Sequence, residues 1–124
     1  MRRYVIDELD DSEMGRLARG LRDMGLAGSI EGLYWLPVPE ALLNDTQRAH
    51  TQTCGPYCVA VETTPDGVSM ELLVRARNRL RCDCVAMADA RVATGLMETL
   101  NALVERLAAP PADGQDGSQG TGPR

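Results

Sequence analysis

The four cysteines of this 124-residue chain occur in two close pairs, and its only histidine precedes one of them. Cys54 and Cys58 are four residues apart, Cys82 and Cys84 are two apart, and His50 lies four residues before Cys54. Thiolate and imidazole are ligands that zinc and iron favour, and two ligand pairs distant in sequence commonly complete a tetrahedral site. These five residues are therefore the candidate metal ligands, with zinc or iron as the candidate ion.

The same cysteines have two other interpretations. Neither pair has the Cys-x2-Cys spacing of zinc ribbons, and free cysteine is often a small buried residue, so we favour a core role for Cys82 and Cys84. A thiol-redox role for Cys54 and Cys58 is weaker because a strand pattern follows, with no helix N-terminus to lower a thiol pKa. A nucleophile built from Cys54 and His50 lacks an identifiable residue to orient the base. An enzyme is therefore the less expected outcome.

Four arginines lie within seven residues, at Arg75, Arg77, Arg79 and Arg81. Guanidinium groups bind phosphate or carboxylate through paired hydrogen bonds, so an anion-binding site is one interpretation. The favoured alternative is a solvent-exposed hairpin whose charge discourages edge-to-edge association of the sheet.

Composition excludes several other chemistries. All 13 basic residues are arginine, so the chain has no P-loop lysine and no Schiff-base lysine. A single histidine rules out a multi-histidine metal site. The net charge of −5 argues against general nucleic-acid binding, which needs a positive surface. Since no apolar run approaches the roughly 20 residues that cross a bilayer, we expect a soluble, cytoplasmic protein without membrane association.

Hydrophobic periodicity predicts the elements that must position these residues. In chain order they are a strand (3–9), a helix (11–24), a strand (30–36), a short helix (40–43), three strands (58–64, 68–75 and 81–87) and a final helix capped by Asp89. Asp10 and Glu13 have capping-box spacing, and Gly25 follows the first helix as a terminating glycine. The polar segment 44–53 predicts a surface loop, which would carry His50.

Asp66-Gly67 predicts a two-residue hairpin turn. The pairs across this hairpin would be Thr63 with Met70, Val61 with Leu72 and Val59 with Val74. This register places Cys58 on the face opposite the apolar residues, whereas Cys82 and Cys84 would share the core face of their strand. The sheet would then separate Cys58 from the other pair, unless a bulge or a later start of pairing shifted it.

Two amphipathic helices and a mostly antiparallel sheet predict an α+β fold, a two-layer sandwich with both helices on one face. Residues 1–109 would form one domain, and 110–124, rich in Pro and Gly, a disordered tail. The other face of the sheet would meet a protein partner or a second copy. We therefore expect a small, non-catalytic binding or assembly domain. A metal-binding or thiol-redox protein is the second hypothesis, and anion binding at the arginine hairpin is the third.

Overall fold

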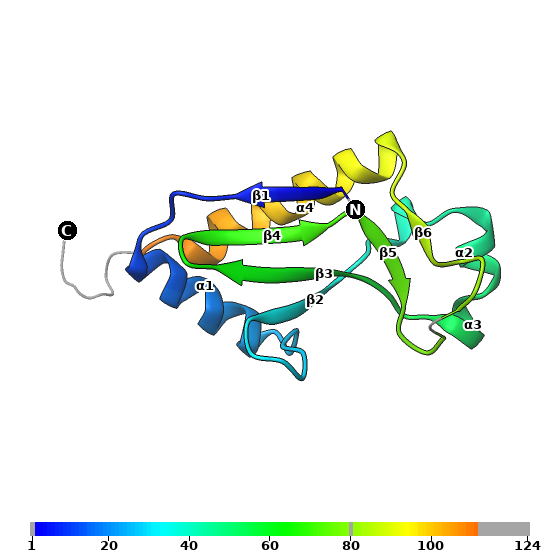
Figure 1. Ribbon diagram of the computed structural model, residues 1–124, viewed down its shortest axis with the longest axis horizontal. Coiled ribbons are helices and arrows are strands. Elements are labelled where there is room, and N and C mark those ends of the chain that lie inside the picture. The colour runs from blue at the N-terminus through cyan, green and yellow to red at the C-terminus, as the bar shows by residue number, and fades with distance from the viewer. Residues whose placement is uncertain (1, 80, 112–124) are drawn as a thin grey trace.

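The computed structural model describes residues 2–79 and 81–111, which form an antiparallel sheet with two long helices packed behind it (Figure 1). Helices α1 (Asp11–Asp23) and α4 (Ala90–Ala108) contact each other and lie against the same face of the sheet. The predicted α+β fold is confirmed. Residues 112–124 of the predicted tail lie outside the described part of the chain.

Strand β3 is the centre of the sheet. The described strands are β1 (Arg3–Ile6), β2 (Leu33–Pro37), β3 (Tyr57–Thr64), β4 (Gly67–Glu71), β5 (Leu73–Ala76) and β6 (Ala86–Met87). One edge of β3 pairs with β2, and its other edge pairs with β5 near its start and with β4 near its end. β1 pairs with the free edge of β4, and β6 pairs with β5.

Capping residues define both long helices as the sequence predicts. The Asp10 side chain accepts a hydrogen bond from the Glu13 amide, and the Glu13 carboxylate accepts one from the Asp10 amide. Gly25 follows α1 with φ +79°, a conformation that favours glycine. The Asp89 side chain accepts from the Val92 amide at the start of α4. Local sequence signals therefore account for three of the four ends of these helices.

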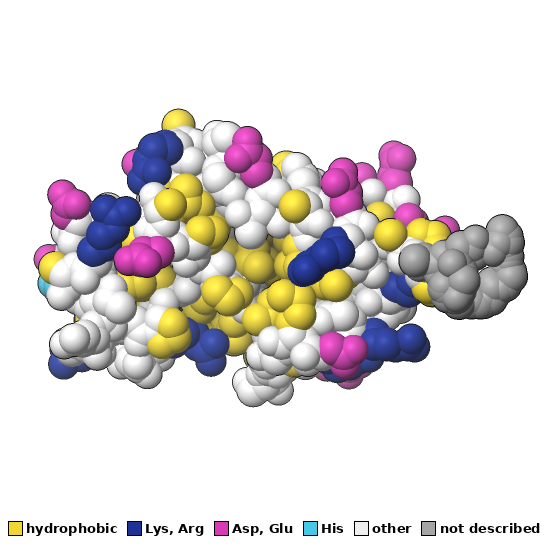
Figure 2. Space-filling model, turned by 180° about the vertical axis from the view of Figure 1, so that it is seen from behind, with side chains coloured by type: hydrophobic (Ala, Val, Ile, Leu, Met, Phe, Trp, Pro, Cys, Tyr) yellow, Lys and Arg dark blue, Asp and Glu magenta, His cyan; other side chains and the backbone are white. Residues whose placement is uncertain are grey.

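The core fills the space between the two helices and one face of the sheet. Its large, almost fully buried side chains are Leu17, Val59, Val61, Val68, Met70 and Leu96, together with the smaller Cys54 and Cys84. Burying each large apolar side chain contributes about 1.5–3 kcal/mol, so most of the stabilising free energy of this layer comes from residues other than cysteine. Figure 2 shows the molecule from the side opposite to Figure 1, where hydrophobic side chains gather near the middle of the surface. Met24, Leu36 and Leu103 line a groove between the helices and the sheet.

The hairpin register differs from the prediction by two residues. The turn residues are Pro65 and Asp66, because Thr64 pairs with Gly67 and Val61 pairs with Met70. Because side chains alternate between the two faces of a sheet, a register shift of two residues keeps every side chain on its predicted face. Gly67 sits in the strand because β1 passes directly over it: a Cβ atom there would collide with the Ile6 carbonyl oxygen.

The predicted strand 68–75 is two strands with a break at Leu72. Between the Val61–Met70 and Cys58–Arg75 pairs, β3 has two residues and the facing chain has four, which makes a two-residue bulge. The Leu72 amide donates to the Arg2 carbonyl, and the Leu72 carbonyl accepts from the Ala88 amide. This break directs β5 along the start of β3, at the end of the sheet where β6 and the short helices gather (Figure 1).

Four other predicted segments need correction. The segment 44–53 is not a loop: it forms α2 (Asp45–Ala49) and, with Cys54, α3 (Thr51–Cys54), because Asn44 and Gln47 make a second capping box. The strand predicted at 81–87 is only Ala86–Met87, since Cys82 and Cys84 lie in a turn.

The strand predicted at 30–36 begins at Leu33, whose amide donates to the Ile30 carbonyl in a preceding turn. The strand predicted at 3–9 ends at Ile6. The short helix predicted at 40–43 is present as η1 (Glu40–Leu42). No helix of the described residues is long and apolar enough to cross a membrane.

Gly67→Ala should lower the free energy of unfolding by about 1–3 kcal/mol, the usual cost of forcing an atom into a packed site, because β1 must move away from β4. Gly15→Ala is the matched control. Its Cβ atom meets nothing within 4 Å on an exposed part of α1, so alanine should stabilise the helix by up to about 1 kcal/mol. Urea unfolding measures both, and equal stability of the two variants would contradict the close approach of β1.

Candidate metal centre

His50 and Cys54 lie one helical turn apart on the same side of the short helices. The Cys54 amide donates to the His50 carbonyl at 2.8 Å, the i to i−4 bond of an α-helix. The helix ends at Cys54, as Gly55-Pro56 predicts, and the chain enters β3 at Tyr57. This exit takes Cys58 away from the helix face that His50 and Cys54 share.

Cys82 and Cys84 lie in the loop between β5 and β6. The Val85 amide donates to the Cys82 carbonyl at 3.0 Å and closes a tight turn around the pair. The Gln47 side-chain amide, 3% exposed, donates to the Cys84 carbonyl at 2.9 Å. The Tyr57 hydroxyl in turn donates to the Gln47 carbonyl at 2.7 Å. Buried hydrogen bonds therefore fix the loop against the helix that carries His50.

The ligand atoms of His50, Cys54, Cys82 and Cys84 all lie within 4.8 Å of one another. His50 Nδ1 is 3.1 Å from Cys82 Sγ, and Cys54 Sγ is 3.6 Å from Cys82 Sγ. Zinc–sulfur bonds of about 2.3 Å in a tetrahedron place two thiolate sulfurs about 3.8 Å apart. The four residues therefore have the separations that a single tetrahedral ion needs.

Two of these ligands are buried and two are partly exposed. Cys54 is 2% exposed and Cys84 is fully buried, whereas His50 and Cys82 reach the surface. An ion held here would sit at the edge of the core, where it can be loaded from solvent yet lies against protein on its inner side.

The thiols of Cys82 and Cys54 have opposite pKa shifts. Hydrogen bonds lower the pKa of Cys82 to about 6, first from the Cys84 backbone amide and then from the Cys84 thiol and His50. Burial, followed by the neighbouring Cys82 and Cys84 thiols, raises the pKa of Cys54 to about 11. At neutral pH the metal-free protein therefore holds a thiolate at Cys82 beside a protonated thiol at Cys54.

Cys58 is the one candidate ligand that stands apart from this group. It lies on β3 with its side chain on the opposite face from Val59 and Val61, as the sequence register predicts. Burial raises the pKa of its thiol, and the cations of Arg77 and Arg75 partly oppose that rise. Sequence reasoning missed Gln47 and Tyr57, which support the site, although Asn44-x-x-Gln47 is a readable capping signal.

The four candidate anion-binding arginines do not form one cluster. Arg75 pairs with Glu71 at 3.0 Å, and the Arg77 guanidinium lies 5.0 Å from the ring centre of Trp35. Arg79 and Arg81 are exposed. Only Arg75 and Arg77 border a common hollow, which is described below.

Searches of protein-family models, curated proteins and solved structures find no match to this chain.

In chelator-treated protein, the alkylation rate of Cys82 by iodoacetamide should rise with a midpoint near pH 6, because the thiolate is the nucleophile. Cys54 should stay unreactive at pH 7, both because its pKa is about 11 and because it is buried. Peptide-resolved mass spectrometry across pH 5 to 9 measures both rates. A Cys82 midpoint near 9, the value of an ordinary thiol, would contradict the lowered pKa.

Proposed function

We propose that this protein holds a single zinc ion through His50, Cys54, Cys82 and Cys84. The observation that carries the proposal is the convergence of three sulfurs and one imidazole nitrogen within 4.8 Å. These ligands come from two segments, and 28 residues separate Cys54 from Cys82. The core-residue interpretation of Cys82 and Cys84 does not explain why the imidazole of His50 points at the same place.

The ligand set favours one zinc ion over an iron–sulfur cluster. Three thiolates and one imidazole are a common ligand set of structural zinc sites. In a two-iron cluster the ligands are divided between two metals, so thiolates on opposite irons lie farther apart than those on one ion. Mutual separations within 4.8 Å fit a single ion.

A structural role for the ion follows from the number of ligands. Four protein ligands fill a tetrahedron, whereas catalytic zinc sites leave one position for water or substrate. The ion would clamp the β5–β6 loop onto α2 and α3 at the edge of the core, beside the buried side chains of Cys54 and Cys84. The protein would then be a non-catalytic binding domain in which zinc holds the shape of one surface loop.

Metal analysis of anaerobically purified protein tests this proposal. We expect about one zinc per chain in the wild type, and loss of that zinc in Cys82→Ala, because three remaining ligands bind zinc far more weakly. Cys58→Ala is the matched control: it removes the same thiol from a residue outside the ligand group and should retain the zinc. Chains with no metal, and with thiols that react only after unfolding, would overturn the proposal. Equal loss of zinc from Cys82→Ala and Cys58→Ala would also overturn the proposal.

A thiol-redox function is the second candidate, favoured by the 3.6 Å between the sulfurs of Cys54 and Cys82. The lowered pKa of Cys82 supplies the nucleophilic thiolate that a peroxide oxidises. That thiolate would attack a peroxide oxygen, breaking the O–O bond and giving a sulfenic acid. The Cys54 sulfur would then displace the sulfenic oxygen as water, which also takes up the Cys54 proton. The two thiols lose two electrons, and the peroxide gains them.

Hydrogen peroxide treatment of zinc-free protein distinguishes this second function. A Cys54–Cys82 disulfide, identified by peptide mapping and by a mass lower by two hydrogen atoms, is the expected product in the wild type and in Cys58→Ala. In Cys54→Ala the oxidation should stop at the sulfenic acid, which dimedone traps. Formation of no disulfide, or of one that includes Cys58, would rule out this function. Zinc-loaded protein should react more slowly because its thiolates are bound to the ion.

A further inference from the structure

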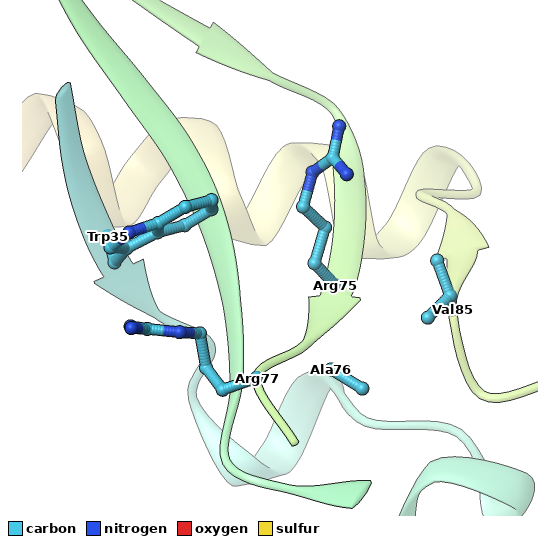
Figure 3. Close-up of a pocket in the computed structure, with 5 residues that line it drawn as sticks. All are labelled: Trp35, Arg75, Ala76, Arg77 and Val85. Carbon is cyan, nitrogen blue, oxygen red and sulfur yellow. The ribbon is translucent and has the colours of Figure 1, made fainter. Parts of the chain in front are cut away.

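A hollow lies over β3 on the face of the sheet away from α1 and α4 (Figure 3). Its volume is about 110 Å³, and its lining residues are Trp35, Arg75, Ala76, Arg77 and Val85. In Figure 3 the Trp35 ring and the Arg75 side chain stand on either side of the central strand. None of these residues belongs to the zinc ligand group.

Strand register explains why the hollow forms. Trp35 pairs with Ala60, and Arg75 pairs with Cys58, and directly paired residues project to the same face of a sheet. The central strand thus contributes two small side chains, while its neighbours contribute long ones. Cys58 and Ala60 are 4% and 6% exposed. The lining of the hollow comes from the neighbouring segments, with the Trp35 indole on one side and the segment from Arg75 to Arg77 on the other.

The charges at the hollow are unequal. Glu71 accepts hydrogen bonds from Arg75 and also pairs with Arg3 at 3.6 Å, so the charge of Arg75 is largely compensated. Arg77 has no carboxylate within salt-bridge distance among the described residues. Burial raises the pKa of the Cys58 thiol, and the guanidinium groups of Arg77 and Arg75 partly oppose that rise, which places their positive charge near this strand. Arg77 is therefore the cation available for a ligand.

The Arg77 guanidinium has hydrogen-bond donors to spare. Its carbon lies 5.0 Å from the ring centre of Trp35, and of its five N–H groups one faces the Cys58 thiol. A carboxylate can accept two of the remaining hydrogen bonds. The apolar side chains at the hollow are Trp35 and Val85, whereas Ala76 contributes backbone because its side chain faces the core with that of Tyr57.

We propose that this hollow, named here the Trp35–Arg77 site, binds a small carboxylate with a planar apolar body, such as an aromatic acid. Arg77 holds the carboxylate, and the ring lies between Trp35 and Val85. The hollow, at about 110 Å³, is smaller than the cavity of about 150 Å³ that encloses a benzene ring, so the bound ring would be partly enclosed and partly exposed to solvent. A strongly hydrated phosphate would leave the apolar walls without a partner. The site does not depend on zinc: its lining residues differ from the ligands.

Fluorescence is a direct test because Trp35 is the only tryptophan in the chain. Titration with benzoate at low salt should change the Trp35 emission saturably, while acetate, which keeps the charge and lacks the ring, should bind at least ten-fold more weakly. Inorganic phosphate should also bind at least ten-fold more weakly. Saturation-transfer NMR on the benzoate protons provides a second readout that does not depend on the indole.

Arg77→Gln should weaken benzoate binding at least ten-fold, because it removes the charge and the paired N–H donors. Arg79→Gln is the matched control: it removes the same charge two residues away, from an exposed side chain that does not line the hollow, and should leave binding unchanged. No saturable signal, equal weakening in both variants, or phosphate and acetate binding as tightly as benzoate would overturn the proposal. Cys82→Ala should lose zinc and still bind benzoate, so a failure of the zinc proposal and a failure of this proposal give different results.

Discussion

The break at Leu72 is the constraint on which the rest of this structure depends. Two strands must pair with the same edge of β3, and they can do so only because four residues on one side face two on the other. The backbone groups of Leu72 keep hydrogen-bond partners at the break, since the Arg2 carbonyl accepts from its amide and the Ala88 amide donates to its carbonyl. A regular hairpin would continue straight past the start of β3 and carry the following loop away from His50. The bulge instead keeps β5 beside Cys58 and returns the chain toward the short helices.

The loop between β5 and β6 serves two surfaces at once. Its far part carries Cys82 and Cys84 to the helix face of His50 and Cys54, and the residues at its two ends, Arg77 and Val85, line the hollow on the open face. The Arg77 amide also donates to the Pro56 carbonyl, two residues from Cys54. An ion at the four candidate ligands would hold the far part of the loop, whereas the hydrogen bond from Arg77 to Pro56 holds the end of the loop that lines the hollow.

Sequence reasoning succeeded where the deciding interactions join residues that are close together in the chain. Asp10 with Glu13, Gly25 and Asp89 define helix ends because their interactions involve residues three or four apart. The same rule applies at Asn44 and Gln47, whose capping box starts α2 although the polar composition of 44–53 predicts a loop. The error at 81–87 had a different origin: small apolar residues alternate there as in a strand, although Cys82 and Cys84 face one point from a turn.

The sequence by itself determined the α+β class, the faces of β3 and the types of residue able to bind a metal. It placed Cys58 on the opposite face from the core, since side-chain alternation survives a register shift of two residues. Only the tertiary structure decided which four of the five candidate ligands meet. That choice depends on the bulge at Leu72 and on the approach of Gln47 to Cys84, contacts between residues far apart in the chain. Such contacts leave no periodic signal in the sequence, because each is fixed by the packing of whole elements.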